Sequence, residues 1–345
     1  FKKEWKDVDE NAFELLTRKG VYPYEYMDSW DKMQETSLPP KEQYFSKLTG
    51  KSISDKDYEF AQKIWKAFKL KNLGQLHDLY LGTDVALLSD VFEAFRGFNL
   101  KHYKLDPAHF LTAPSLSWSA CLKYTDIQLE LPTCPTMSNF FDKGLIGGIS
   151  FISNLYARAN NAGLGDEFDI EKLISYIFMV DCNNQYGWAM SQYLPTGGFN
   201  WCDEKSNEEW EEIIKSLKDD DDKGFFFEVD LEYPKELHDE HDTFPCAPEK
   251  ISVQESMLSP YQRELGEKLG VKFGSEKLCL TLQHKTKYVL HYRNLKQYLD
   301  LGLKLKKVHR ALEFNQSPWL KPYIDLNTRL RRNATCKFDE DQAKL

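Results

Sequence analysis

An aspartate that directly follows an apolar run is the first candidate for chemistry in this sequence. Residues 174–180 form an apolar run of strand length and Asp181 comes next, which predicts a strand buried on both faces that ends at a carboxylate. Ligands of open α/β sheets gather at the carboxyl ends of strands, and a carboxylate there can hold Mg²⁺ beside a substrate phosphate. The backbone carbonyl of Cys182 can reach the same ion, and Tyr186 lies about one turn further on, where its ring can pack against a sugar. The alternative is that Asp181 caps the helix or turn that follows.

A tyrosine and an aspartate four residues apart, Tyr80 and Asp84, form the second candidate. On a helix two such residues share a face, so the phenol can orient a water molecule beside a metal held by Asp84. The structural alternative places Tyr80 in the core and makes Asp84 the N-cap of the amphipathic stretch that it opens.

Composition and charge limit the classes of protein that fit. The chain has 345 residues and is 41% hydrophobic, which is enough to bury a sizeable core. Its formal charge of -9 argues against a protein that binds nucleic acid with its whole surface. Its seven cysteines never form a CxxC pair, so we expect reduced thiols, no structural zinc and an intracellular protein, with nucleus and cytoplasm both open. No apolar run reaches the length of a membrane span, and the first residues lack the apolar stretch of a secretory signal, so neither membrane nor secretion is indicated.

Charge is unevenly distributed along the chain. Residues 218–223 and 238–242 are acidic, and four adjacent aspartates are typical of a solvated loop. His238 and His241 could share a metal, but the prolines and acids around them favour an exposed loop. Residues 285–332 are basic with aromatic residues interleaved, which suits a surface that follows a nucleic-acid strand; an ordinary solvated face is the alternative.

Periodicity predicts mostly helices in the first quarter and a mixed α/β pattern afterwards. Helices are expected over 9–19, 58–70 and 84–98, then a proline-containing connection that leads to a turn at Gly147 and Gly148. The expected elements of the second part are a strand at 174–180, a Gly- and Pro-rich loop at 194–201, a helix at 208–217, strands at 225–231 and 288–292, a helix at 295–305 and a basic helical segment from 318.

The segment Asp181-Cys-Asn-Asn-Gln-Tyr-Gly-Trp-Ala-Met190 resembles the first catalytic palm motif of protein-primed family B DNA polymerases, the organellar and viral group that includes Polinton (Maverick) transposons. Gln185 departs from the usual leucine. Six further stretches resemble the same transposon branch in the same order: 19–26 (KGVYPYEY), 80–93 (YLGTDVALLSDVFE), 147–150 (GGIS), 194–201 (LPTGGFNW), 228–234 (EVDLEYP) and 291–296 (HYRNLK), and 316–324 (QSPWLKPYI) adds another.

The resemblance implies DNA-directed DNA polymerase activity with an associated 3'–5' exonuclease, and it implies roles for individual residues. Asp181 would hold one of two Mg²⁺ ions, with Mn²⁺ as an alternative, and Tyr186 would stack under the incoming sugar and exclude a 2' hydroxyl. Tyr80 and Asp84 match the third exonuclease motif. The implied nucleotide-binding residues are Asn183, Asn184, Tyr186 and Lys344, and the implied DNA-binding residues are Gly147, Gly148, Arg293 and Arg329.

The fold implied is mixed α/β, an RNase H-like exonuclease part followed by the start of a palm. We expect the C-terminal part of the exonuclease domain over 1–110, a connector with the Gly-Gly turn over 111–160, the palm portion over 161–245, and an insertion with the start of the fingers over 246–345. Template and primer DNA, deoxynucleoside triphosphates and a terminal priming protein are the implied partners.

Several motifs of the family are missing from these 345 residues: the first two exonuclease carboxylate motifs, most of the finger-helix motif, which would begin at Lys344, and the second metal-binding palm motif. We therefore expect a fragment that performs neither reaction alone. Two alternatives remain open at this point, an RNase H-like exonuclease with a decayed polymerase part and a non-catalytic DNA-binding remnant of a mobile element.

Overall fold

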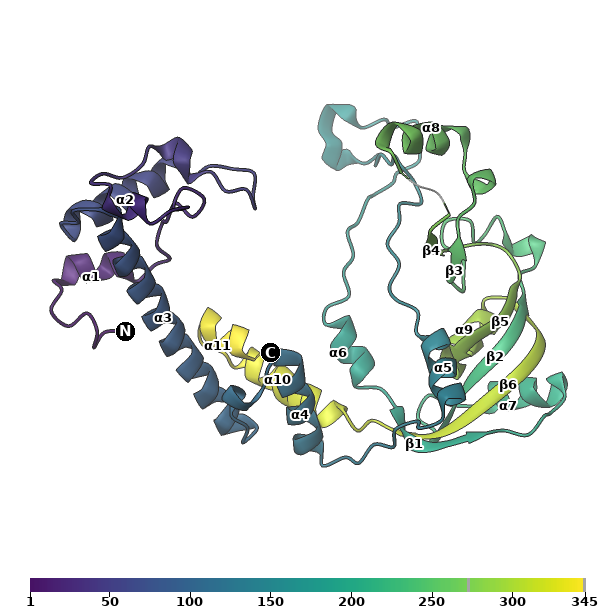
Figure 1. Cartoon of the computed structure of the whole chain (residues 1–345). Helices are drawn as coiled ribbons and strands as arrows, with labels where there is room; N and C mark the ends of the chain where they lie inside the picture. Colours follow the sequence, from purple (N-terminus) through teal and green to yellow (C-terminus); the bar gives the residue numbers. More distant parts are fainter. Residues whose placement is uncertain (272–273, 344–345) are drawn as a thin grey trace. The chain divides into compact units, whose positions relative to one another are not determined.

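The chain folds into two compact units in the computed structural model, which describes residues 1–271 and 274–343 (Figure 1). We call residues 1–120 with 334–345 the helical unit and residues 121–333 the sheet unit. The expected domain boundaries at 110, 160 and 245 stay predictions. Among the described residues no helix is long and apolar enough to cross a membrane.

The helical unit is built around one long helix. Its elements are α1 (Glu10–Leu16), η1 (Asp31–Gln34), η2 (Lys41–Tyr44), α2 (Asp55–Ala67), α3 (Leu73–His102), η3 (Pro107–His109), most of α4 (Ala113–Thr125) and α11 (Lys337–Gln342). Ser54 and Asn72 start α2 and α3 by accepting backbone N–H groups with their side chains. The apolar stripes of α1, α2 and α3 meet in a core formed by Leu16, Phe60, Ile64, Leu73 and Leu76. The three helices predicted from periodicity are confirmed, and α3 is longer at both ends than predicted.

A four-stranded antiparallel sheet forms the centre of the sheet unit, with strand order β1-β6-β2-β5. The strands are β1 (Leu194–Trp201), β2 (Lys223–Glu232), β5 (Lys285–His291) and β6 (Lys304–Ser317). Strand β6 pairs with β1 on one side and with β2 on the other, so it holds the sheet together although it comes last in the chain.

Helices cover both faces of this sheet. On one face α7 (Asn207–Ser216) and α9 (Tyr292–Asp300) pack on the odd-numbered residues of β2, with Trp210 and Leu295 fully buried. A capping box between Ser206 and Glu209 starts α7. On the other face α5 (Pro135–Gly144) packs Phe140 against the sheet. The mixed α/β class predicted from the sequence is confirmed.

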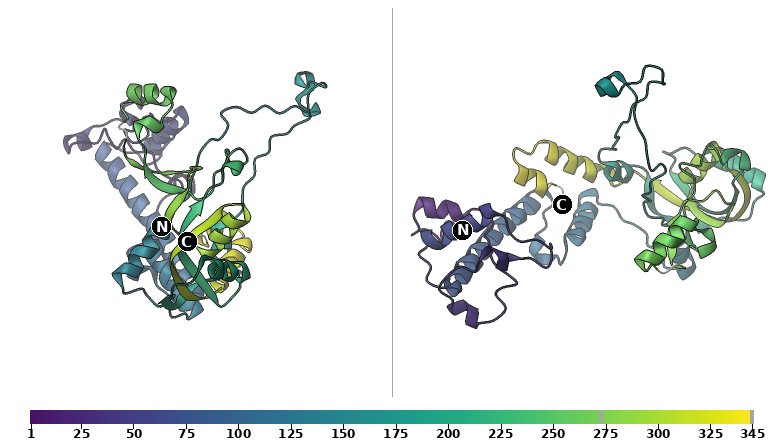
Figure 2. Two further views of the ribbon diagram at one scale, coloured as in Figure 1. Left: turned by 90° about the vertical axis from the view of Figure 1, so that its right-hand side faces the viewer. Right: turned by 90° about the horizontal axis from the view of Figure 1, so that it is seen from above.

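The remaining elements of the sheet unit are short: η4 (Ala162–Glu167), α6 (Gln185–Met190), η5 (Lys235–Leu237), the two-stranded sheet of β3 (Glu249–Ser252) and β4 (Glu276–Cys279), η6 (Glu255–Met257), α8 (Pro260–Leu269) and α10 (Lys321–Arg332). Residues 150–180 make a long excursion that projects away from the four-stranded sheet in both views of Figure 2.

Three expectations about helices and strands are wrong. Residues 174–180 form no strand and are largely exposed, Met179 at 99%, because the described chain offers them only the isolated bridge between Asn160 and Ser175 as a backbone partner. Residues 194–201 form β1 rather than a loop, since their glycines fit register shifts in the pairing with β6. The helix expected over 295–305 ends at Asp300, and Gly302, with φ of 97°, turns the chain into β6.

Candidate active-site residues

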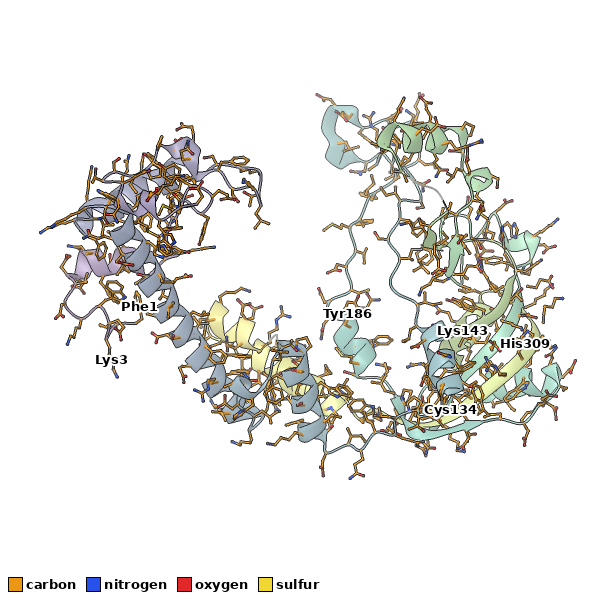
Figure 3. The ribbon with its side chains drawn as sticks, in the orientation of Figure 1. Phe1, Lys3, Cys134, Lys143, Tyr186 and His309 are labelled. Atoms are coloured by element: carbon orange, nitrogen blue, oxygen red, sulfur yellow. The ribbon has the colours of Figure 1, made fainter. Side chains whose placement is uncertain are left out.

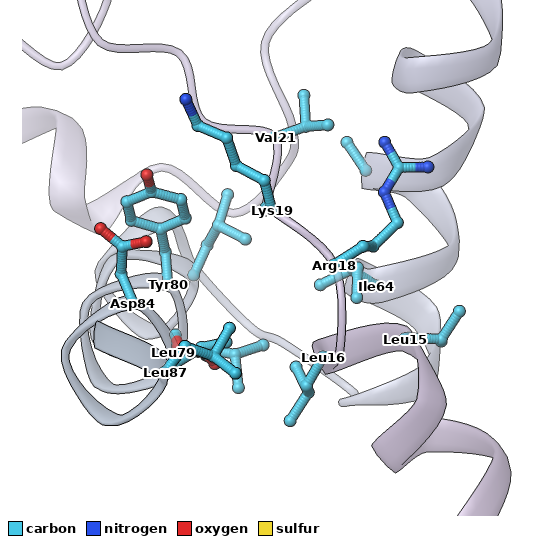
Figure 4. Close-up of a pocket in the computed structure, with 14 residues that line it drawn as sticks. Leu15, Leu16, Arg18, Lys19, Val21, Ile64, Leu79, Tyr80, Asp84 and Leu87 are labelled. Atoms are coloured by element: carbon cyan, nitrogen blue, oxygen red, sulfur yellow. Dashed lines mark hydrogen bonds between the residues drawn. The ribbon is translucent and has the colours of Figure 1, made fainter. Parts of the chain in front are cut away.

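Tyr80 and Asp84 lie on one face of α3 and open on a small cavity of about 40 Å³ in the helical unit. Figure 4 shows the Tyr80 ring, the Asp84 carboxylate and the Lys19 side chain on one side of this cavity. Asp84 is exposed and stands in the interior of α3, so the interpretation of Asp84 as an N-cap is wrong. Tyr80 is half-buried, and its ring lines the cavity.

The segment 19–26 supplies the surroundings of Tyr80. The Tyr24 hydroxyl, 56 residues away in sequence, is hydrogen-bonded to the Tyr80 hydroxyl, and the Tyr22 ring stacks on Tyr80 with 4.9 Å between centroids. A Cβ added at Gly20 would lie 2.7 Å from the Tyr80 ring, so glycine lets the backbone pass against this ring. Two segments selected separately from the sequence therefore form one local structure around Tyr80.

Burial and the Tyr24 hydroxyl raise the pKa of Tyr80, so its phenol stays protonated over the physiological range. A protonated phenol can donate a hydrogen bond, as the orientation of a water molecule requires. Lys19 and Tyr24 were not singled out as site residues from the sequence. The resemblance of residues 19–26 to the polymerase family pointed to this segment, but only the fold shows that it packs against Tyr80.

Asp181 lies outside every strand of the structure and is exposed, which contradicts its expected position at the end of a buried strand. Asn184, with φ of 54° and ψ of 42°, is the residue at the N-cap position of α6, so Asp181 does not cap that helix either. Tyr186, labelled on α6 in Figure 3, is 85% exposed. Cys182 and Asn183 are exposed beside them.

A metal site is not completed by the described residues. Mg²⁺ takes oxygen ligands, which Asp84 and Asp181 can supply, but a pair of ions needs several carboxylates. Within residues 1–271 and 274–343, no three His, Cys, Asp or Glu side chains come together in a way that could hold a metal ion. His238 and His241 are both half-buried, and Nδ1 of His241 lies 2.7 Å from the Tyr233 hydroxyl.

The residues expected to contact DNA are spread over the sheet unit. Gly147 and Gly148 lie in an irregular exposed segment, and the structure places no turn there. Arg293, at the start of α9, forms an ion pair of 2.6 Å with Asp219 of the acidic loop. Arg329 is exposed in the last turn of α10. Lys344 falls outside the described residues.

Comparison with known proteins finds similar solved structures but no match by sequence. No family model matches the chain, and no curated protein matches it. The orthorhombic crystal form of phi29 DNA polymerase has a TM-score of 0.43 and 13% identity over 94% of this chain and 46% of that one. Phi29 DNA polymerase complexed with primer-template DNA and incoming nucleotide substrates has a TM-score of 0.39 and 13% identity, over 95% and 46%. The chain thus spans about half the length of these neighbours, and neither similarity assigns a role to any residue.

Proposed function

We propose that this chain is the interior part of a DNA-directed DNA polymerase of the protein-primed family B type, with an associated 3'–5' exonuclease, and that it belongs to the Polinton-like branch. The observation that carries the proposal is the structure around Tyr80. Two stretches that resemble that branch, 19–26 and 80–93, are separated in sequence and pack together around Tyr80, one of the two side chains to which the resemblance gives an exonuclease role.

In this proposal the exonuclease part uses Asp84 as one oxygen ligand of Mg²⁺ or Mn²⁺, and Tyr80 orients the attacking water through its protonated hydroxyl. The metal would supply a polarised phosphate and a more acidic bound water. Lys19, on the same side of the cavity, is suited to a phosphate oxygen because its ammonium group is a compact positive charge.

In the polymerase part, Asp181 and the carbonyl of Cys182 would contribute oxygen ligands to a metal. The exposed ring of Tyr186 would lie under the incoming sugar, where its volume excludes a 2' hydroxyl. Asn183, Asn184 and Lys344 are proposed to contact the nucleotide, and Gly147, Gly148, Arg293 and Arg329 to contact DNA. Template-primer DNA, deoxynucleoside triphosphates and a terminal priming protein are the proposed partners.

We propose further that the 345 residues perform neither reaction alone, because two ions need several carboxylates and no three His, Cys, Asp or Glu side chains of the described residues come together in a way that could hold a metal. The test is primer extension and 3' end degradation with Mg²⁺, in parallel for this chain and for a longer protein that contains it. We expect no reaction from the chain alone. We expect both reactions from the longer protein, with extension lost in Asp181→Ala and degradation lost in Asp84→Ala.

The matched control is Asp239→Ala, which removes an exposed aspartate of the sheet unit and should leave both reactions unchanged. Extension by the isolated chain that disappears in Asp181→Ala would overturn the claim that it is inactive alone. Extension by the longer protein that survives Asp181→Ala would overturn the polymerase role of Asp181.

A second candidate is an exonuclease whose polymerase part has decayed. It is favoured by the contrast between the two sites, since the Tyr80 side chain is held by packing and hydrogen bonds whereas Asp181 is exposed and outside the sheet. Degradation without extension by the longer protein would select this candidate.

A further inference from the structure

Strand β6 carries two β-bulges opposite β2 that change which side chains face outward. The register with β2 shifts between Glu228 and Val229 and again between Asp230 and Leu231. A bulge places two residues of one strand opposite one residue of its partner. Consequently Leu305, Val308 and Ala311 all pack toward the core shared with α7 and α9, and the pairs between them, 306–307 and 309–310, face the other side.

The outward pairs of β6 meet a row of carboxylates on β2. Arg310 binds Glu228 through two hydrogen bonds of 2.8 and 3.0 Å, and His309 Nε2 lies 2.9 Å from Asp230 Oδ1. Lys306 forms an ion pair with Glu232 at the end of the row. Each carboxylate of β2 is therefore already matched by one basic side chain of β6.

A further basic side chain, in each case a lysine, acts on each of these carboxylates. The positive charge of Lys143 acts on Glu228, that of Lys307 on Asp230 and that of Lys304 on Glu232, and each contributes to holding the carboxyl pKa below its usual value. All three lysines are exposed, and among the described residues none of them has an ion pair or a hydrogen bond of its side chain. These three lysines thus add positive charge to a face on which each β2 carboxylate already has a basic side chain from β6 beside it.

We call Lys143, Lys304 and Lys307, with the three ion pairs beneath them, the cationic face. Figure 3 labels Lys143 on α5 and His309 on β6, which mark two sides of this face. Alternate residues of a strand are about 6.6 Å apart, and Lys307 and Lys304 lie opposite Asp230 and Glu232, so the register with β2 sets these two lysines about 6.6 Å apart along the sheet. Successive phosphates of an extended nucleic-acid strand have a comparable spacing.

A groove of about 800 Å³ borders the cationic face along β6. Its lining includes Lys205, Lys306, Lys307 and the ring of Trp201, which is 37% exposed and has the Arg310 guanidinium 5.1 Å from its centroid. Asp203 and Glu204 also line the groove, so its charge is mixed at one end. An aromatic ring beside a row of cations is the combination that binds single-stranded nucleic acid with little sequence preference.

We propose that the cationic face binds the backbone of single-stranded nucleic acid, with Lys143, Lys304 and Lys307 each contacting a phosphate and Trp201 available for a base. The proposal rests on the proposed function in that it takes nucleic acid as the substrate. It adds a contact surface that lies on β6 and α5 and uses none of the residues assigned above to metal, nucleotide or DNA.

The test is the salt dependence of binding of the full 345-residue chain to a fluorescein-labelled oligodeoxythymidylate of about 20 nucleotides, long enough to span this row. Each phosphate contact contributes about 0.7 to the slope of log K against log salt for single strands. We therefore expect the triple variant Lys143→Gln, Lys304→Gln, Lys307→Gln to reduce the slope by about 2. The matched control, Lys235→Gln, Lys250→Gln, Lys277→Gln, removes three exposed lysines of the same unit and should leave the slope unchanged.

The possible results separate this proposal from the proposed function. Equal slopes for the triple variant and the wild-type chain would overturn the proposal that the cationic face binds nucleic acid. Nucleic acid would then remain a partner that binds elsewhere on the chain. Binding of polyglutamate with a Kd close to that of the oligonucleotide would overturn it as well, because the face would then be a general polyanion surface. In the longer protein that contains this chain, loss of primer extension in Asp181→Ala, together with an unchanged salt slope of oligonucleotide binding, would support both ideas independently. Unfolding curves of all variants in urea show whether each one is folded.

Discussion

His291 provides the sharpest test of the packing in the sheet unit because it joins β5 to α9. Its ring packs against Tyr292 at 4.5 Å, Phe226 at 5.2 Å and Phe314 at 5.8 Å between centroids, and its Nδ1 accepts the backbone N–H of Arg293 at the helix start. Burial, with a smaller contribution from the positive charge of Arg293, lowers the pKa of His291 to about 4, and the Asp219 carboxylate opposes this. The folded chain therefore keeps this imidazole neutral in mildly acid solution.

The sign and size of the effect follow from the linkage between protonation and folding. Because the folded-state pKa lies below the ordinary value of 6.5, the unfolded chain binds a proton first as the pH falls. The contribution to stability is complete above about pH 6.5 and is lost as the pH falls toward 4. Between about pH 7.5 and pH 5.0 this shift alone corresponds to a decrease of about 2 kcal/mol in the free energy of unfolding. Because His291 is only partly buried, we expect a decrease of about 1 kcal/mol.

The assay is urea unfolding at both pH values for the wild-type chain and for His291→Asn. Asparagine can accept the same helix-start hydrogen bond but does not titrate, so this variant should be less stable at both pH values and lose less stability between them, by about 1 kcal/mol. The control is His109→Asn, an exposed histidine of the helical unit, whose pH dependence should parallel that of the wild type. The same pH dependence in wild type and His291→Asn would refute the assignment of a neutral buried imidazole.

Three further predictions concern an ion pair and the packing around two glycines. Arg310→Met leaves Glu228, which is 5% exposed, without its partner. We expect the free energy of unfolding in urea to fall by about 2–3 kcal/mol, less than for a fully buried pair because Arg310 is partly exposed. Adding Glu228→Gln should recover part of this loss, and no recovery would contradict the charge argument. Gly97→Ala should raise the stability of the helical unit by about 0.5–1 kcal/mol, because Gly97 lies inside α3 and an added Cβ meets nothing within 4 Å. Gly224→Ala should instead lower the stability of the sheet unit by about 1–3 kcal/mol, because its Cβ would lie 2.5 Å from the Phe314 ring. Equal thermal midpoints for the two glycine variants would contradict the packing described here.

Elements with a strong local signal were predicted from the sequence. The 3.6-residue periodicity of α2 and the amphipathic pattern of α7 are local features, and both helices form close to where they were expected. Strand β2 was found because its apolar and acidic residues alternate over residues 227–232. These signals depend on neighbouring residues alone, which is why one sequence suffices to find them.

Elements that depend on distant partners were missed. The two bulges of β6 disturb its alternation, so residues 304–317 show no clear period of two and only the pairing with β1 and β2 identifies the strand. Residues 174–180 have the composition of a buried strand, but composition does not supply the neighbouring strand that would satisfy the backbone. For the candidate site, the four-residue spacing of Tyr80 and Asp84 predicted a shared helix face, whereas the packing of Tyr22 and Tyr24 on Tyr80 required the fold.

The position of β6 at the centre of the sheet also determines when this unit can fold during synthesis. Thr196 of β1 bonds to Asn315 of β6 across 119 residues, so the aromatic strand β2 leaves the ribosome well before the strand that separates it from β1. At roughly 5–20 residues per second the wait is on the order of ten seconds, during which β2, with Phe225 and Phe227, can pair only with β5 once that strand has been made. A chain truncated before Lys304 would stay in that state permanently, and we expect it to aggregate in cells where the 345-residue chain folds.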